Sequence, residues 1–204
     1  MQQIKLLTIV FGLMACEAKP PAHTWKETDG VLVMEAEDGL YVADVSGWKM
    51  ETTFSGYNGN GYVVWRGPGD WGPEKKTYNS ISRKGHVISF PFTITNPGVY
   101  YVKVLNYHLE KDGDNDVWTS VDKGDWGKTY DWQINAWTTD ERGEWAKVTL
   151  TTGDHLVELA GRSEGFAVDQ VIIFQERLGE RFIPKMSNQA NDVESVRKPD
   201  KISK

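Results

Sequence analysis

Met34-Glu35-Ala36-Glu37-Asp38 is one of two stretches that decide the fold of this 204-residue chain, and the other is Gly161-Arg162-Ser163-Glu164-Gly165-Phe166-Ala167-Val168-Asp169. The first continues the apolar run of residues 31–34, and the second leads into the apolar run of residues 171–174. Short apolar runs rich in β-branched residues predict buried strands. Because the two ends of a domain often lie close together, we expect these strands to be neighbours in a β-sandwich.

The first stretch carries two carboxylates with the spacing of one strand face. Glu35 and Glu37 lie two residues apart, and side chains alternate between the faces of a strand. Two like charges on one face repel unless both meet water or a cation lies between them. Asp169 could supply a third carboxylate to a hard cation such as calcium. The residues leave two interpretations open, a calcium site and a solvated edge strand.

The two stretches resemble the carbohydrate-binding modules of families 6 and 35 and their relatives, which share the Glu-Ala-Glu-Asp opening and the Gly-Arg-Ser-x-Gly-Phe-x-Val-Asp closing segment. Residues 56–65 and 96–102 are also similar to those modules, so the resemblance covers roughly residues 31–175. It implies an all-β fold, a galactose-binding-like β-sandwich of the jelly-roll type. It also implies carbohydrate binding and a structural calcium ion held by Glu35, Glu37 and Asp169.

One position departs from those families. Many members carry an asparagine two residues before the closing aspartate as a ligand contact, and this chain has Ala167 there. We therefore expect the usual ligand site to be altered.

The amino terminus predicts export. Residues 1–5 end in a positive charge, and residues 6–14 form an apolar stretch too short to span a bilayer, which is typical of a signal peptide. Leu13-Met14-Ala15-Cys16 resembles the bacterial lipobox, which implies cleavage after residue 15 and lipidation of Cys16. The alternative is ordinary secretion, with Cys16 lost or free. Cys16 is the only cysteine, so no disulfide can form within the chain.

Length and composition predict one domain outside the cytoplasm, in the periplasm or on the cell surface. We expect a signal peptide over residues 1–15, a tether over 16–29, a β-sandwich over 30–176 and a polar, flexible tail over 177–204, from which Phe182 could fold back. The predicted strands are residues 31–37, 61–65, 86–94, 99–107, 117–121, 145–150, 155–160 and 168–174. No segment has convincing helical periodicity. The formal net charge of −6 disfavours nucleic acid as a partner.

The chain has nine tryptophans, and several of them lie in loops rich in glycine and aspartate. Sugars present apolar C–H faces to aromatic rings and hydroxyl groups to polar side chains. A tryptophan in such a loop is a candidate stacking platform, although it could equally be a lid over the core. The candidate stacking residues are Trp65, Trp71, Trp118, Trp126 and Trp132, of which Trp118 suits the core equally well.

Four polar residues are the other candidate ligand contacts: Arg66, Asn115, Asp116 and Arg162. Residues 112–116 alternate carboxylates like the start of a calcium-binding loop, but Val117 and Lys123 stand where that motif needs glycine and glutamate. A solvated turn is the alternative there. Arg162 could bind an anionic or otherwise modified polysaccharide, or pair with Glu164 or Asp116.

Catalysis and adhesion are the rival functions. A glycosidase needs two facing carboxylates, and a lyase needs a base near a cation. The available side chains are Asp114, Asp116, Glu141, Glu144, Tyr107 and His108. Their spacing selects no pair, so we expect a non-catalytic, membrane-anchored lipoprotein that binds polysaccharide for a separate degrading or uptake system. A structural or adhesion lipoprotein without a sugar ligand is the remaining alternative.

Overall fold

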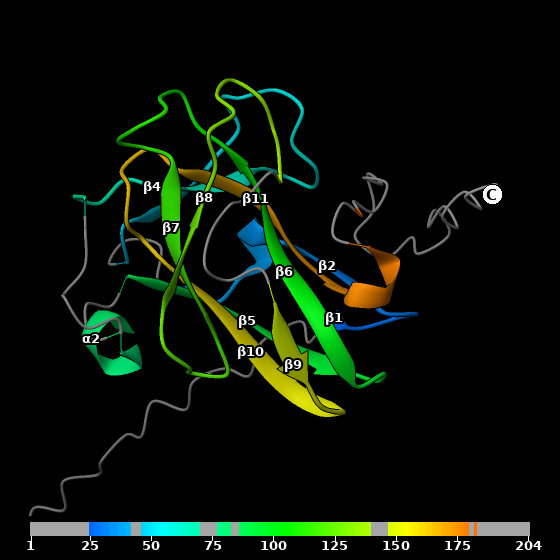
Figure 1. Ribbon diagram of the computed structural model, residues 1–204. Helices are drawn as coiled ribbons and strands as arrows, with labels where there is room; N and C mark the ends of the chain where they lie inside the picture. The colour runs from blue at the N-terminus through cyan, green and yellow to red at the C-terminus, as the bar shows by residue number, and fades with distance from the viewer. Residues whose placement is uncertain are drawn as a thin grey trace, which may run out of the picture.

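Two β-sheets pack face to face in the computed structural model of the protein (Figure 1). The structure describes residues 25–41, 46–69, 77–82, 86–139, 147–179 and 182. Cys16, the expected signal peptide, most of the expected tail and Trp71 lie outside the described residues.

The first sheet has five strands in the order β1-β5-β10-β7-β8. Their bounds are Trp25–Lys26 (β1), Val87–Ile94 (β5), Gly153–Ala160 (β10), Asp116–Val121 (β7) and Gly127–Tyr130 (β8). The short β1 pairs with β5 in parallel, and every other pairing in this sheet is antiparallel.

The second sheet has six strands, with β2 pairing β11 beside the path β3-β4-β11-β6-β9. Their bounds are Val31–Glu35 (β2), Trp48–Glu51 (β3), Tyr62–Trp65 (β4), Gly98–Tyr107 (β6), Val148–Leu150 (β9) and Ala167–Gln175 (β11). Along one edge of β11, residues 167–168 pair with β4 and residues 170–174 pair with β2. The partner therefore changes at Asp169.

Three short helical turns complete the described chain: η1 (Ala36–Asp38), α2 (Tyr78–Ser82) and η2 (Glu176–Leu178). None of the helices in the described part of the chain is long and apolar enough to cross a membrane.

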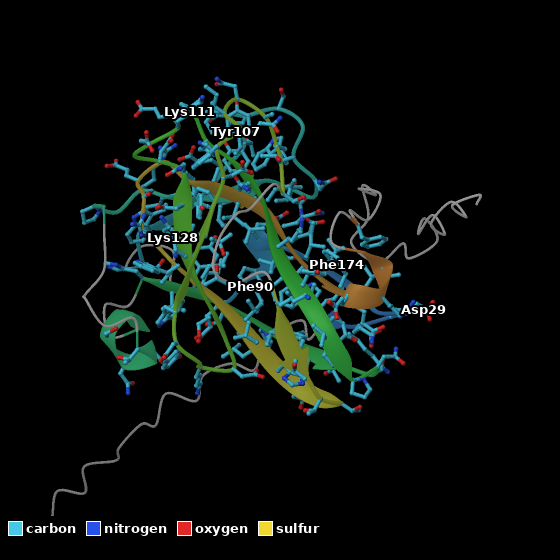
Figure 2. All side chains as sticks on the ribbon, viewed as in Figure 1. Asp29, Phe90, Tyr107, Lys111, Lys128 and Phe174 are labelled. Carbon is cyan, nitrogen blue, oxygen red and sulfur yellow. The ribbon has the colours of Figure 1, made fainter. Side chains whose placement is uncertain are left out.

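The core lies between the two sheets and follows from alternation along the strands. In β5 the buried residues are Ile88, Phe90, Phe92 and Ile94, which project between the sheets while their neighbours are partly exposed. Figure 2 shows Phe90 in this central position. By contrast, every residue of β11 is buried, because strands flank it on both edges and side chains cover both of its faces.

The expected all-β jelly-roll sandwich is confirmed, including the pairing of the first long strand with the last. Three strands were missed: β1, β3 and β8. The expected strand over 31–37 ends at Glu35, where the chain enters η1. The tether boundary was placed too late, because Trp25 and Lys26 already pair with β5. Phe182 does fold back, with its ring centroid 5.2 Å from that of Phe174.

Candidate functional site

Asp169 marks the point where β11 changes its partner. The pairing of β11 with β6 is irregular between Val168 and Gln170, and the Asp169 side chain is fully buried there. Its carboxylate accepts hydrogen bonds from the backbone N–H of Asn58 at 3.0 and 3.1 Å and from Asn58 Nδ2 at 2.9 Å. The loop before β4 is thereby tied to the last strand.

Glu35 and Glu37 face the same region from the end of β2 and from η1. Gln170 Nε2 donates a 2.8 Å hydrogen bond to Glu35 Oε1, and the backbone N–H of Asn60 donates one of 2.8 Å to Glu37 Oε1. The Oε2 atoms of both glutamates are buried and have no hydrogen-bond partner among the described residues. Such orphaned oxygens are costly unless another group satisfies them.

Burial and mutual repulsion disfavour charge on all three carboxylates. Burial, together with the charges of Asp169 and Glu37, raises the pKa of Glu35 to about 7, although Gln170 opposes the shift. Burial also raises the pKa of Asp169 to about 6, against the hydrogen bonds from Asn58. The pKa of Glu37 is raised mainly by burial. This electrostatic environment would favour a bound cation.

The donor set fits a hard cation in its chemistry, and Gly59 lets the backbone approach two of the carboxylates closely. Gly59 has a φ of +64°, and a Cβ at this position would collide with Glu37 Oε1 and lie 3.4 Å from Glu35 Oε2. Carboxylate oxygens are the ligands that calcium prefers. Within the described chain, however, no three Asp, Glu, His or Cys side chains form a ready metal cluster. A calcium ion here would therefore require further oxygen ligands.

A cluster of aromatic side chains adjoins this acidic region and was missed in the sequence. Tyr62 and Ala167 form its buried base, with Val64 beside them, and four half-buried rings pack over this base: Phe54, Tyr57, Tyr107 and Trp137. The Phe54 and Tyr107 rings stack with centroids 4.2 Å apart. Ala167, at the expected ligand position, is therefore covered by this cluster. Only the run Gly-Tyr-Asn-Gly-Asn-Gly-Tyr at residues 56–62 hinted at it.

The loops at one end of the sandwich also carry Trp132, whose residue surface is 54% exposed. Figure 1 shows the cyan loop before β4 and the green loops after β6 and β8 together at this end, and Figure 2 places Tyr107 and Lys111 there. Trp132 follows the buried Asp131, whose Oδ1 accepts from the backbone N–H groups of Trp132 at 2.6 Å and Gln133 at 2.8 Å.

Asp131 is itself fixed by two asparagines. Asn115 Nδ2 donates to the Asp131 carbonyl at 3.0 Å, and Asn106 Nδ2 donates to Asp131 Oδ2 at 3.3 Å. Asn115, predicted to contact ligand, is buried and supports the Trp132 loop instead. The residue pattern contained no signal for Asp131, because its role depends on partners from β6 and from the loop before β7.

Three predicted stacking residues are buried, which contradicts their proposed role as exposed platforms. Trp65 fills a space beside Gly161, where a Cβ would collide with the indole, and its Nε1 donates to the Pro68 carbonyl at 3.2 Å. Trp126 stacks on Tyr78 with ring centroids 5.8 Å apart. Trp118 lies with Trp126 in one buried cluster.

The charged candidates are engaged in ion pairs within the fold. Arg162 Nη1 bonds Asp116, which also accepts from Ser163 Oγ, and the guanidinium lies 5.0 Å from the Trp118 ring centroid. The ion-pair alternative for Arg162 therefore describes its state in this structure. The Arg66 side chain is 41% exposed, and its Nε and Nη2 both donate to Glu51, at 2.7 Å each.

The side chains considered for catalysis have structural partners. Asp114 accepts from the backbone N–H groups of Leu109 and Glu110 at 2.9 Å each, and Asp116 holds Arg162. His108 is buried with Nδ1 2.6 Å from the Glu110 carbonyl. Glu141 and Glu144 lie outside the described residues.

Comparison with models of known protein families finds no match, and comparison with curated protein sequences finds no relative. Solved structures do resemble the chain. A GH26-CBM35 β-(1,4)-mannanase from Podospora anserina matches with a TM-score of 0.54 and 18% identity over 72% of this chain. The match covers 28% of the mannanase, so the chain spans little more than a quarter of that enzyme.

Two isolated modules give weaker matches. A family 35 carbohydrate-binding module from Clostridium thermocellum has a TM-score of 0.48 and 18% identity, over 71% of this chain and 98% of the module. The C-terminal CBM6 of LamC, a marine laminarinase from Zobellia galactanivorans, has a TM-score of 0.45 and 15% identity, over 71% and 99%. At 18% identity, the similarity to the mannanase structure concerns the fold alone.

Proposed function

We propose that the protein is a non-catalytic polysaccharide-binding protein whose loop end captures a glycan. One observation carries the proposal. Trp132 is 54% exposed on a loop that the buried Asp131 holds in place, within a fold that resembles a structure containing a carbohydrate-binding module. Ordering a loop when a ligand binds costs conformational entropy. The hydrogen bonds of Asp131 order this loop before binding and so reduce that cost. Preorganisation of this kind favours a binding function.

Binding would combine stacking with polar contacts. The face of an aromatic ring accepts the apolar C–H face of a sugar, and polar side chains bond its hydroxyl groups. Gln133 and Asn135 are exposed beside Trp132, and the half-buried rings of Phe54, Tyr107 and Trp137 extend the aromatic area of the loop end. Binding itself requires no bond to be broken, so these residues need only orient the sugar and exclude water.

We infer that calcium has a structural role beside this site. Glu35, Glu37 and Asp169 would hold the ion, and the two buried Oε2 atoms without partners support this assignment. The ion would supply positive charge to a buried acidic cluster. Asn58 and Asn60, which bond Asp169 and Glu37, follow Tyr57 of the aromatic cluster. Order in the metal region would thus help to position the aromatic loop.

Lipid attachment at Cys16 remains a proposal from the lipobox-like sequence. It would anchor the protein to a membrane outside the cytoplasm, in the periplasm or at the cell surface. There the protein would hold polysaccharide for a separate degrading or uptake system. The mass of the mature amino-terminal peptide checks this, since an unmodified Cys16 would contradict it.

The binding proposal predicts a specific loss in Trp132→Ala. We expect retardation in affinity gels by at least one polysaccharide, and at least a tenfold weaker affinity for that polymer in the variant, since buried aromatic contacts often dominate binding. The melting temperature should stay within about 2 °C, because truncating an exposed side chain changes stability little.

Met50→Ala is the matched control, because Met50 is similarly exposed but lies on β3 at an edge of the other sheet. Its retardation should equal that of the wild type. Unchanged binding by Trp132→Ala would reject this site, and absence of retardation by every polymer would favour adhesion without a sugar ligand. Release of soluble sugars from a bound polymer would instead identify an enzyme.

A further inference from the structure

A strip of side chains runs from Trp132 along β8 and adds two residues, Lys128 and Tyr130, to those considered above. Lys128 and Tyr130 lie two residues apart on β8 and so project from one face, opposite Trp118 and Asp116 of β7. The Tyr130 and Trp132 ring centroids are 6.2 Å apart. We call Lys128, Tyr130 and Trp132 the β8 strip. β8 is an edge strand of the five-stranded sheet, so the strip borders the edge of that sheet.

Lys128 supplies the strip with a cation, and the two neighbouring carboxylates are already engaged. Asp116 bonds Arg162 and Ser163, and the buried Asp131 accepts from the backbone N–H groups of Trp132 and Gln133. Lys128 Nζ is 4.0 Å from Asp116 Oδ2, at the outer limit of an ion pair, and the Lys128 side chain keeps 35% of its surface exposed. Two cationic groups thus share one carboxylate. Such a surface favours an anionic group placed over Lys128.

The two aromatic side chains of the strip place ring surfaces beside the cation that would bind the anionic group. Lys128 Nζ lies 4.6 Å from the Tyr130 ring centroid, so the ammonium is held against an aromatic face. Trp132 adds an exposed ring on the loop side. In Figure 2, Lys128 lies on the flank of the sandwich, away from the end that carries Tyr107 and Lys111. A ligand that touches all three residues must therefore extend from the loop end along the flank.

We propose that the β8 strip is a subsite for an anionic glycan chain, an inference that rests on the proposed polysaccharide binding. Sugar rings pack on Trp132 and Tyr130, and a negatively charged substituent, either a sulfate ester or a uronate carboxylate, contacts Lys128. Lys128, and not Arg162, binds the negatively charged substituent, because Asp116 already pairs with the Arg162 guanidinium.

The test measures binding of the full mature chain by titration calorimetry to polymers matched in backbone and different in charge. The probes are a sulfated galactan with its desulfated form, and polygalacturonate with its methyl-esterified form. The first pair detects a sulfate and the second a carboxylate. Lys128→Met keeps the length of the side chain and removes its charge, and Lys26→Met on β1, at the opposite edge of the same sheet, is the control.

We expect the wild type to bind one charged polymer more tightly than its neutral form. Lys128→Met should weaken that binding about tenfold, as loss of a charge-assisted contact does, and change binding of the neutral form less than twofold. Trp132→Ala should weaken binding of both forms, and Lys26→Met should match the wild type. Raising the salt concentration should reduce the wild-type preference for the charged form.

Two outcomes would overturn the subsite and leave polysaccharide binding intact. One is wild-type affinity of Lys128→Met for the charged polymer, and the other is an equal loss on the charged and neutral forms. If the wild type binds only the neutral forms, the subsite is likewise rejected and polysaccharide binding stands. If the wild type binds none of the four polymers and no polymer in the gel panel, both the subsite and the proposed function are rejected.

Discussion

At the scale of single residues, Glu27 shows how hydrogen bonds in the fold make a buried carboxyl group more acidic than an ordinary glutamate. The residue is 1% exposed and accepts hydrogen bonds from the backbone N–H groups of Thr95 and Asn96 at 3.0 Å each. Thr95 Oγ1 and the N–H of Gly30 also donate to it. Burial alone would raise the pKa of Glu27, but these bonds outweigh burial and lower the pKa to about 2.

Glu27→Gln should therefore destabilise the protein in a pH-dependent way. The pKa falls from 4.5 in the unfolded chain to about 2 in the fold, so the carboxylate stabilises the fold above pH 4.5 and this contribution is lost as the pH falls toward 2. We expect the variant to lose about 3 kcal/mol of unfolding free energy at pH 7, as the pKa difference implies. Urea unfolding of the wild type and the variant at pH 7 and pH 3 measures this loss of unfolding free energy.

The exposed Glu110→Gln is the control for Glu27→Gln and should unfold like the wild type at both pH values. At pH 3 the deficit of Glu27→Gln should be smaller than at pH 7. A deficit of the same size at both pH values would show that shape, and not charge, explains the role of Glu27.

The exposure of individual tryptophans could not be predicted from their neighbours in the sequence. Trp126 and Trp132 both directly follow an aspartate outside the strands, yet Trp126 is buried and Trp132 is exposed. The difference comes from tertiary partners. Tyr78, far away in the sequence, stacks on Trp126, whereas Asp131 fixes the backbone of Trp132, which remains 54% exposed beside the Tyr130 ring. The composition of the two loops predicts neither of these contacts.

At the scale of elements, His155 joins the start of β10 to the turn after β7. Its Nδ1 lies 2.7 Å from Asp122 Oδ2 and its Nε2 lies 2.8 Å from the Thr151 carbonyl. The backbone N–H of Leu156 also donates to Asp122 Oδ1 at 2.9 Å. Both ring nitrogens face acceptors, so the arrangement favours the doubly protonated ring. Burial lowers the pKa of His155, but Asp122 and Thr151 outweigh it, and the net shift is upward.

This contact should stabilise the fold only while the ring is charged. Because the pKa of His155 in the fold is raised above its ordinary value of 6.5, its contribution is complete below pH 6.5 and is lost as the pH rises through the folded-state pKa. His155→Gln should cost about 1 kcal/mol at pH 6, as a partly exposed charged hydrogen bond does, and less at pH 9. Urea unfolding at both pH values tests this.

Asp122→Asn is the matched variant for the His155 contact. Asp122 has a φ of +50°, a conformation that asparagine tolerates, so the turn should persist while the negative charge is removed. The variant should show the same reduced pH dependence as His155→Gln. An unchanged pH dependence in either variant would assign the effect to other groups.

Strands were predictable from sequence where apolar residues alternate or run together, and not where short strands lack that pattern. The alternation of β5 and the apolar run of β11 both gave strands close to their observed bounds. β3 reads Trp-Lys-Met-Glu, an alternation only four residues long with a single pair of apolar residues, and β8 reads Gly-Lys-Thr-Tyr, which has no apolar alternation. Both form because a neighbouring strand supplies backbone partners, a tertiary effect that no local pattern contains.

At the scale of the whole molecule, the acidic region connects parts of the chain that are distant in sequence. Asn58 bonds Asp169 across 111 residues, and Glu35 bonds Gln170 across 135 residues. The three predicted metal ligands were inferred from a family resemblance, and the fold does bring them into one region. The orphaned oxygens of Glu35 and Glu37, and the bonds of Glu37 and Asp169 to the loop before β4, could not be predicted, because they depend on η1 and on the irregular pairing of β11.

A structural calcium ion should make the stability of the whole domain depend on free calcium. A ligand that binds only the folded state stabilises it by about 4 kcal/mol at a thousandfold excess over its dissociation constant. For a domain of this size, each kcal/mol shifts the melting temperature by about 2–4 °C. We therefore expect a chelator to lower the melting temperature by roughly 10 °C and excess calcium to restore it. Differential scanning calorimetry at constant pH and ionic strength gives the comparison.

The double variant Glu35→Gln/Glu37→Gln separates a bound ion from a general salt effect. It keeps the size of both side chains, removes two carboxylates from a buried acidic cluster and should no longer respond to calcium or chelator. Magnesium should restore the wild type poorly, because it demands a stricter octahedral geometry than calcium does. A wild-type melting temperature that is the same with and without chelator would show that the cluster is stable without a metal, with its carboxylates protonated or hydrated instead.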